Sequence, residues 1–188
     1  MSQYLELTEV SPLCLTVLNS EVWRGTARHI DRLEQPEQWL ALVGDWLGWP
    51  DDVRANLWAS RHSEAAQQAL AAARQARAGV RAVLESVLDE GRPWHGPATF
   101  PTLAWTAQGL QAAPPPSDWF DLGPYLWLSL AGLLSGEHAK RLKRCADQRG
   151  CGWYFLDHSR NLSRQYCSSA ACANYARQQR FRQKKEAT

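Results

Sequence analysis

Hydrophobic and polar positions in residues 1–136 alternate mostly with the period of an α-helix. The longest such pattern covers residues 63–91, where Ser63 can cap a helix and Gly91 can terminate it. A helix of this length spans about 42 Å, because each residue adds 1.5 Å. The apolar stripe that we expect to face the core is Ala66, Leu70, Ala73, Ala76, Val80, Val83, Leu84, Val87 and Leu88.

Shorter segments carry the same period. In residues 36–48, Trp39 and Trp46 lie seven positions apart on one helical face, which favours core packing over an aromatic ligand cage. Residues 51–61 predict a second short helix, and residues 118–136 an apolar one. Residues 137–145 are expected to continue helically.

The Pro- and Gly-rich stretch before residue 118 breaks this pattern. Within it, residues 98–111 predict a short β-hairpin, with Pro101 in an edge strand or at a break. The predicted fold class is therefore mainly α. An N-terminal helical domain at 1–136, with this short hairpin, precedes a small C-terminal module at 137–188 that ends in a basic helix.

Charge divides the chain at the same place. Residues 1–136 hold 9 arginines and no lysine against 15 acids, a net charge of −6, whereas residues 137–188 hold 12 basic residues against 4 acids, a net of +8. A basic module attracts polyanions, since Lys and Arg release condensed counterions from phosphates. A solvated basic tail is the competing interpretation of the same charge.

The composition argues against a membrane protein. Apolar residues make up 45% of the chain and charged residues 21%, and no apolar run approaches the roughly 18–20 residues of a membrane span. No Lys or Arg precedes Arg24, whereas a secretory signal begins with a basic region. We therefore expect a cytoplasmic protein without a membrane partner, in which reducing conditions disfavour structural disulfides.

Four of the five cysteines cluster in the basic module. They form one pair separated by five residues and one separated by four, with fifteen residues between the pairs, so two thiolate pairs can complete a tetrahedral Zn²⁺ site. The module has too few apolar residues to fold unaided, and zinc binding contributes about 10–16 kcal/mol at such sites. The predicted ligands are Cys145, Cys151, Cys167 and Cys172. Two disulfides, free thiols, or replacement of one cysteine by His138 or His158 remain alternatives.

Catalytic chemistry is disfavoured. A catalytic zinc keeps one position open, whereas four cysteines fill the tetrahedron. Asp157, His158 and Ser159 are the residue types of a hydrolase triad, but consecutive side chains point to alternate faces and cannot converge on one atom. Cys14, alone in an apolar segment, is expected to be a small buried hydrophobe. We expect no catalytic residues and no enzyme activity.

The segment CGWYFLDHSRNLSRQYCSSAACANYAR, residues 151–177, closely resembles the CGNR-type zinc finger. Matching positions are Cys151, Gly152, Trp153, Phe155, Asp157, Ser159, Arg160, Asn161, Arg164, Cys167, Ser168, Cys172 and Asn174. Upstream, LCLTVLNS at 13–20 is similar to the opening of the ABATE-type domain that usually precedes this finger. The resemblance implies a stress-induced bacterial transcription regulator that binds zinc.

Two departures from the family pattern stand out. Thr16 occupies a position where the family tends to have Asp. Ala173 and Tyr175 replace the Gly and Arg of the naming tetrapeptide, which removes one candidate phosphate contact.

The residues themselves also favour nucleic acid. Ser168 can cap a helix that reaches Lys185, and a metal-anchored basic helix can enter the major groove of duplex DNA. The predicted DNA-contacting residues are Arg160, Arg164, Arg177, Arg180, Arg182, Lys184 and Lys185.

DNA-binding transcription regulation is therefore the leading predicted function. The alternative is a zinc-stabilised protein-interaction module whose basic helix packs on the acidic N-terminal domain, and an enzyme in that domain is a distant third. A homo-oligomer and a small-molecule ligand of the N-terminal domain stay open.

Overall fold

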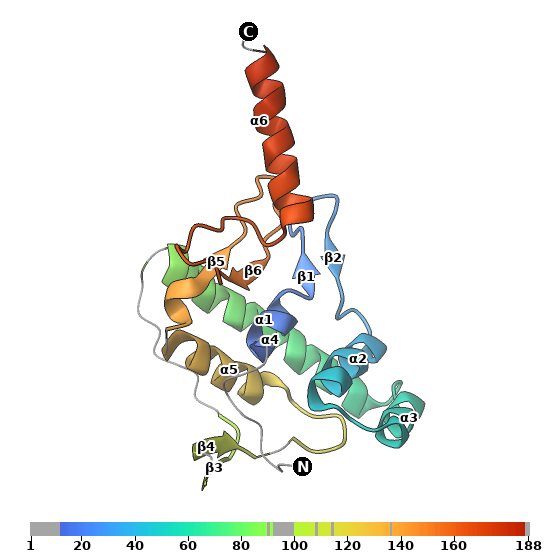
Figure 1. Cartoon of the computed structure of the whole chain (residues 1–188). Helices are drawn as coiled ribbons and strands as arrows, with labels where there is room; N and C mark the ends of the chain where they lie inside the picture. Colours follow the sequence, from blue (N-terminus) through green and yellow to red (C-terminus); the bar gives the residue numbers. More distant parts are fainter. Residues whose placement is uncertain are drawn as a thin grey trace.

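The computed structural model describes residues 12–89, 91, 100–107, 109–113, 115–135 and 137–186. Figure 1 shows a body of helices from which the C-terminal helix projects. The helices of the body are α1 (Leu13–Leu18), α2 (Pro36–Leu47), α3 (Asp51–Ala59), α4 (Glu64–Asp89) and α5 (Gly123–Ser135). The projecting helix is α6 (Asn174–Glu186). The predicted fold class, a mainly α chain with a cysteine module and a final basic helix, is confirmed.

Helix α4 is the central element of the body and packs against α5, α1 and α2. The Ser63 hydroxyl accepts a hydrogen bond from the Ala66 amide at 3.2 Å, which confirms the predicted cap. Gly91 has a φ of +65°, the left-handed conformation that suits a helix stop. Every member of the predicted apolar stripe is buried or partly buried.

The tryptophans of α2 pack in the core, as predicted. Trp39 is fully buried, and the centroid of its ring lies 5.0 Å from that of Trp119 and 5.3 Å from that of Phe120. Trp46 is partly buried and its ring meets Tyr125 edge-on at 6.3 Å. These aromatic contacts join α2 to the segment that leads into α5.

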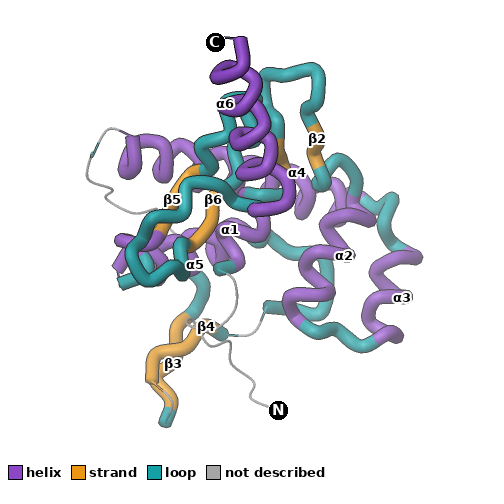
Figure 2. The backbone as a smooth tube through the Cα atoms, turned by 45° about the horizontal axis from the view of Figure 1, so that its top comes forward, coloured by secondary structure: helices purple, strands orange, loops and turns teal. Residues whose placement is uncertain are grey.

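Within the described residues, three antiparallel two-stranded ladders accompany the helices, and Figure 2 draws strands in orange. The strand pairs are β1 (Glu21–Val22) with β2 (Ile30–Asp31), β3 (Leu103–Thr106) with β4 (Gly109–Ala112), and β5 (Leu142–Arg144) with β6 (Tyr154–Leu156). The β3–β4 pair confirms the predicted hairpin, and Pro101 precedes its first strand. The first two residues of the predicted range lie outside the described residues, as does Gly136, the expected stop of α5.

The prediction that residues 137–145 run helically into the first clustered cysteine was wrong. One 3₁₀ turn, Ala139–Arg141, is followed directly by β5. Leu142 is buried in the core of the body, and β5 pairs with β6 in the register Leu142 with Leu156 and Arg144 with Tyr154. Pairing with a strand distant in sequence outweighs the local helical preference here.

The β1–β2 hairpin is fixed to α4 by buried arginines. Arg77 donates to both carboxylate oxygens of Asp31, each at 2.6 Å, and Arg81 donates to Glu21 at 2.7 Å. Both arginine side chains are 6% exposed. The carboxylates therefore satisfy two charges that would otherwise be buried without partners.

The cysteine module packs directly on the helical body. Leu142 and Tyr154 belong to the main hydrophobic core, together with Cys14, which is 1% exposed as predicted. The Asn19 side chain at the end of α1 donates to the Tyr154 carbonyl at 2.8 Å and accepts from the Tyr154 amide at 2.9 Å. This pair of bonds joins α1 to β6 as a further strand would.

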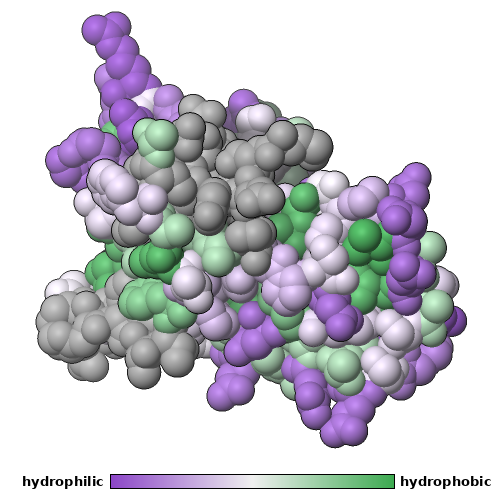
Figure 3. All heavy atoms as spheres, turned by 90° about the horizontal axis from the view of Figure 1, so that it is seen from below, coloured by the Kyte–Doolittle hydropathy of each residue, from purple (hydrophilic) through white to green (hydrophobic). Residues whose placement is uncertain are grey.

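On the face seen in Figure 3, the side chains that protrude furthest are hydrophilic, and apolar side chains lie between them. Among the residues that the structure describes, no helix has both the length and the apolar character that crossing a bilayer requires.

Candidate metal centre

The β5–β6 hairpin, the loop after it and the first turn before α6 bring the four clustered cysteines together. Cys145 directly follows β5, and Cys151 lies in the turn before β6. Cys167 ends the long loop after β6, and Cys172 lies in a π-helical turn, Ser169–Ala173, that opens α6. The four sulfur atoms all lie within 4.8 Å of one another, as the sequence spacing predicted.

The sulfur geometry fits a tetrahedral zinc ion. Sγ of Cys167 lies 3.8 Å from Sγ of Cys151 and 3.8 Å from Sγ of Cys172. A tetrahedron with Zn–S bonds of about 2.3 Å has edges of about 3.8 Å. A disulfide needs about 2.05 Å, and all five cysteines are free thiols, so the disulfide alternative does not describe this arrangement. Neither His138 nor His158 belongs to the cluster.

Electrostatics in the cluster also call for a cation. A hydrogen bond from the Cys151 thiol, together with one from Cys167, lowers the pKa of Cys145. The pKa of Cys167 is raised, because its thiol donates to Cys145 and Cys151 and its own thiolate would be repelled by theirs. The four sulfurs therefore cannot ionise together unaided. Zn²⁺ supplies the positive charge that allows all four to bind as thiolates.

Two glycines shape the turn that carries Cys151. Gly150 and Gly152 have φ values of +88° and +69°, a conformation that other residues rarely adopt. The Cys145 amide donates to the Trp153 carbonyl at 2.8 Å, so backbone pairing continues past β5. The side chains of Cys145 and Cys151 both point toward the other two cysteines. The Cys167 amide in turn points at Sγ of Cys145 at 3.4 Å.

The start of α6 is capped as predicted. The Ser168 hydroxyl accepts from the Ala171 amide at 3.2 Å, and the Ser168 carbonyl accepts from the Ala173 amide at 2.9 Å. The second bond has the wide spacing of a π-helical turn, which places the buried Cys172 toward the other sulfurs. The metal cluster therefore fixes the first turn of the basic helix.

A buried carboxylate organises the loop between β6 and Cys167. Asp157 has no solvent exposure, and its oxygens accept from Lys143 Nζ at 2.7 Å, the Arg164 amide at 2.9 Å, and the amide and hydroxyl of Ser159. Lys143 Nζ also donates to the carbonyls of Leu162 and Arg164. Burial opposes ionisation, but the Lys143 and Ser159 contacts outweigh it and lower the pKa of Asp157. Lys143 was not recognised in the sequence, because its partners lie beyond β6 and are distant from it along the chain.

A second polar group connects the body to α6. The Arg149 guanidinium lies 3.7 Å from the centroid of the Tyr175 ring and 5.2 Å from that of Trp23, and it pairs with Asp147. The Trp23 amide also donates to the Cys151 carbonyl at 3.3 Å. Tyr175, which departs from the family pattern, thus has a structural role: it stacks on an arginine that the β1–β2 loop also contacts.

The predicted DNA-contacting residues lie on two parts of the module. Five of them are exposed on α6: Arg177, Arg180, Arg182, Lys184 and Lys185. Arg164 is also exposed, but its guanidinium lies over the Phe155 ring at 4.8 Å and its nitrogens donate to the carbonyls of Tyr166 and Cys167. Arg180 donates to the Tyr166 hydroxyl at 3.3 Å, so Arg164 and Arg180 meet around one tyrosine. Within the described residues, no hydrogen bond, ion pair or ring contact links Arg160 to the others.

A hairpin and a basic helix joined by four clustered cysteines define a structural zinc module. Residues 141–185 match the family model of the CGNR zinc finger. This match and the four cysteines within metal-binding distance together support Zn²⁺ as the cofactor. None of the curated proteins matches the chain. The ABATE-type likeness of the upstream helices stays a prediction.

Proposed function

We propose that the protein is a transcription regulator that binds duplex DNA through its zinc-anchored helix α6. The observation that carries this proposal is the position of α6. Figures 1 and 2 show this helix projecting from the rest of the chain, with only its first turns near the other elements. Its 13 residues span about 20 Å, long enough to lie along a major groove about 12 Å wide.

The charges of α6 suit a polyanion. The helix carries five basic residues and one acid, Glu186. Among the described residues, Arg177, Arg180 and Arg182 form no ion pair with Asp or Glu, and none of the three is buried. A helix that packed on the acidic body would bury these guanidinium groups against carboxylates. Their accessibility therefore favours a partner outside the chain.

The zinc module holds α6 rigidly at its base. The cysteine cluster fixes its first turn, and Arg149 stacks on Tyr175 one residue into the helix. Preorganised basic groups lose little conformational entropy on binding, which supports specific contacts rather than a solvated tail. In this proposal the helices upstream form a regulatory domain of ABATE type, and the protein acts in the cytoplasm.

A protein partner is the second candidate, favoured by one side chain. Phe181 on α6 is 72% exposed between basic residues. An exposed aromatic group in a projecting helix suits a hydrophobic groove on another protein. Contact of the same ring with a thymine methyl group would serve DNA binding instead.

Salt-dependent titration of a fluorescent duplex, selected from a random pool, tests the proposal. If five to seven basic side chains reach phosphates, the slope of log affinity against log salt is about −5 to −6. Arg177→Gln is expected to weaken binding by about 1–3 kcal/mol and to relax preference at one base position, because this residue lies near the helix start.

The matched control is Lys140→Gln, an exposed basic residue that pairs with Glu137 outside α6. It is expected to leave DNA affinity unchanged. Undetectable or salt-independent binding by the wild-type protein would replace the proposal by the protein-interaction alternative. A Phe181→Ala variant that keeps full DNA affinity would show that this ring does not contribute to DNA binding and would leave it available to a protein partner.

A further inference from the structure

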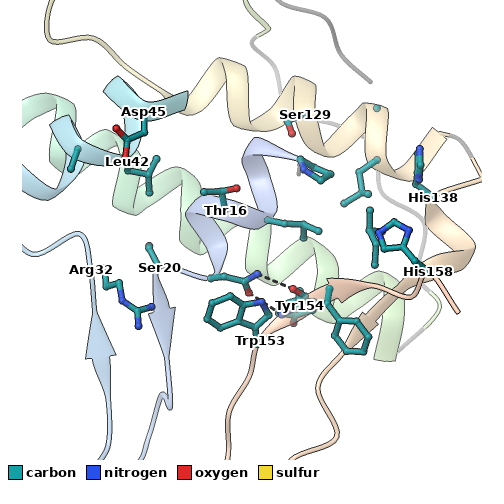
Figure 4. Close-up of a pocket in the computed structure, with 18 of the residues that line it drawn as sticks. Thr16, Ser20, Arg32, Leu42, Asp45, Ser129, His138, Trp153, Tyr154 and His158 are labelled. Atoms are coloured by element: carbon teal, nitrogen blue, oxygen red, sulfur yellow. Dashed lines mark hydrogen bonds between the residues drawn. The ribbon is translucent and has the colours of Figure 1, made fainter. Parts of the chain in front are cut away.

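We infer that the junction between the helical body and the zinc module is a binding site for a small organic anion with a flat apolar body. A cavity of about 1180 Å³ lies between α1, α2, α5 and β6. Figure 4 shows residues of all four elements facing it, among them Thr16, Leu42, Ser129 and Tyr154. This volume is ample for a ligand of drug size, since such sites range over about 300–1,000 Å³.

The floor and walls of the cavity are largely apolar. Leu15, Leu133, Tyr154 and Phe155 line it and are buried. The partly buried indole of Trp153 adds a flat aromatic surface on the side of the zinc module. Several other lining residues, such as Thr16 and Ala41, are exposed, so the cavity opens to solvent. Such walls favour a ligand with a planar hydrophobic part.

Of the described residues that line the cavity, the acid already has a partner, whereas the basic side chains do not. Its one acid, Asp45, is already paired with Arg54 at 2.8 Å. The Asn19 side chain is occupied by the Tyr154 backbone. By contrast, the side chains of Arg32, His138 and His158 form no hydrogen bond or ion pair with any described residue. Within the described part of the chain, the charged group of the cavity that lacks a partner is therefore the Arg32 guanidinium, and the two imidazoles are further polar groups without partners.

These donors lie at two ends of the cavity. In Figure 4, Arg32 extends from the end of β2 toward Trp153, whereas His138 and His158 lie together at the opposite end. A guanidinium binds carboxylate, sulfonate or phosphate in a bidentate manner. A ligand whose anionic group pairs with Arg32 can pack its ring against the indole of Trp153. It then contacts the permanent charge and the flat aromatic surface of the cavity at the same time.

A ligand in this cavity would touch Trp153, which is directly connected to two of the clustered cysteines. Trp153 follows the ligand Cys151 by two residues, and its carbonyl accepts from the amide of the ligand Cys145. A ligand that binds only when the zinc module is folded stabilises the folded module and so opposes its opening. We therefore expect slower zinc loss when the site is filled. Regulation of DNA binding by the same contact rests on the proposed function, but the site itself does not.

The experiment compares two probes on the zinc-loaded full chain, without DNA. 8-Anilino-1-naphthalenesulfonate carries the proposed anion on a fused ring, and N-phenyl-1-naphthylamine has the same rings without the sulfonate. Fluorescence titration is expected to show one site per chain for the sulfonate, at least tenfold tighter than for the neutral amine. Arg32→Gln is expected to remove this tenfold preference and to leave the neutral amine unaffected.

Two further variants test the location. Ala41→Trp on α2 and Thr16→Phe on α1 each fill the cavity from an exposed position and are expected to abolish binding of both probes. Arg182→Gln, on α6 and away from the cavity, is the control and is expected to bind both probes as the wild type does. Circular dichroism and zinc content establish that each variant is folded.

Zinc release to an excess of chelator supplies the second readout. The saturating sulfonate probe is expected to slow release severalfold in the wild type and not in Arg32→Gln. Equal affinity for the two probes would overturn the anion assignment. Unchanged sulfonate binding in a folded Ala41→Trp or Thr16→Phe variant would overturn the site. If the wild-type protein binds the sulfonate probe as expected but shows no DNA binding in the titration described above, the proposed function is rejected and this site is not.

Discussion

The helical body and the zinc module are held together by different forces. In the body, a continuous cluster of buried apolar side chains extends from α1 to α5. In the module, the corresponding cluster contains only Phe155 and three of the cysteines as buried members. We therefore expect burial of apolar surface to be enough to fold the first region, and the second to depend on a metal ion and on polar contacts such as that of Asp157.

The two regions nevertheless share residues at their interface. Leu142 and Tyr154 lie in the strands that carry the zinc ligands and pack in the core of the body. Asn19 connects α1 to the same strand. Loss of the metal should therefore unfold the module and weaken the body without unfolding it, and the variants below test this division.

The largest effect is expected from loss of zinc. Cys167→Ser removes one of four ligands, so the module loses a large part of a zinc-binding free energy that is about 10–16 kcal/mol for an intact site at neutral pH. Mass spectrometry should find about one zinc per wild-type chain and much less in the variant. Circular dichroism should show that most helical signal survives chelation, because α1 to α5 need no metal. A single cooperative loss of all helical signal would show that the two regions fold as one unit.

The second-largest effect is expected from breaking a buried ion pair of the body. Asp31→Asn leaves the Arg77 guanidinium, 6% exposed, without its bidentate partner and is expected to cost about 3 kcal/mol in urea unfolding. Asp45→Asn, which breaks the exposed pair with Arg54, is the control and should cost less than about 1 kcal/mol. Equal losses in the two variants would contradict a special role for the buried pair.

The same pair predicts a pH dependence. Burial opposes ionisation of Asp31, but its hydrogen bond with Arg77 outweighs this and lowers the pKa of Asp31 in the folded state. The carboxylate therefore stabilises the fold above its unfolded pKa of about 3.9, and this stability is lost as the pH falls toward the lower folded value. Below about pH 4, the difference in unfolding free energy between wild type and Asp31→Asn should shrink.

The boundary itself is tested by Asn19→Ala. This change removes both hydrogen bonds between the Asn19 side chain and the backbone of Tyr154, at an expected cost of roughly 2–3 kcal/mol. Zinc release to a chelator should also become faster, because β6 carries the turn with Cys151. Thr16→Ala, exposed on the same helix, should change stability by less than about 0.5 kcal/mol. If Asn19→Ala unfolds like the control, the two regions are held together by apolar contacts alone.

The smallest effect is expected from restoring the family residue at the start of α6. Tyr175→Arg removes the stack on Arg149, which contributes about 0.5–2 kcal/mol at this partly buried site. It also adds one candidate phosphate contact, so the salt slope of DNA binding should become steeper by about one unit. Salt titrations of both proteins measure this change. An unchanged slope would mean that position 175 faces away from the DNA.

The sequence by itself determined the features that depend on local order. The cap at Ser63, the stop at Gly91 and the apolar stripe of α4 follow from the helical period, because neighbours three and four residues apart share a face. The four zinc ligands follow from thiol chemistry and spacing, and the burial of Cys14 from its apolar surroundings. The cap of α6 at Ser168 also needed no more than its place before the helix.

Only the tertiary structure decided the features that join distant segments. Residues 142–144 form a strand because β6 offers it backbone partners, although the local pattern favours a helix. Arg77 and Arg81 are buried because carboxylates from the β1–β2 hairpin, far earlier in the chain, meet them, and Tyr175 stacks because Arg149 is held beneath it. The cavity exists only where α1, α2, α5 and β6 meet. The physical reason is common to all of these: each contact depends on loop closure and packing between residues far apart in the chain, which local periodicity does not encode.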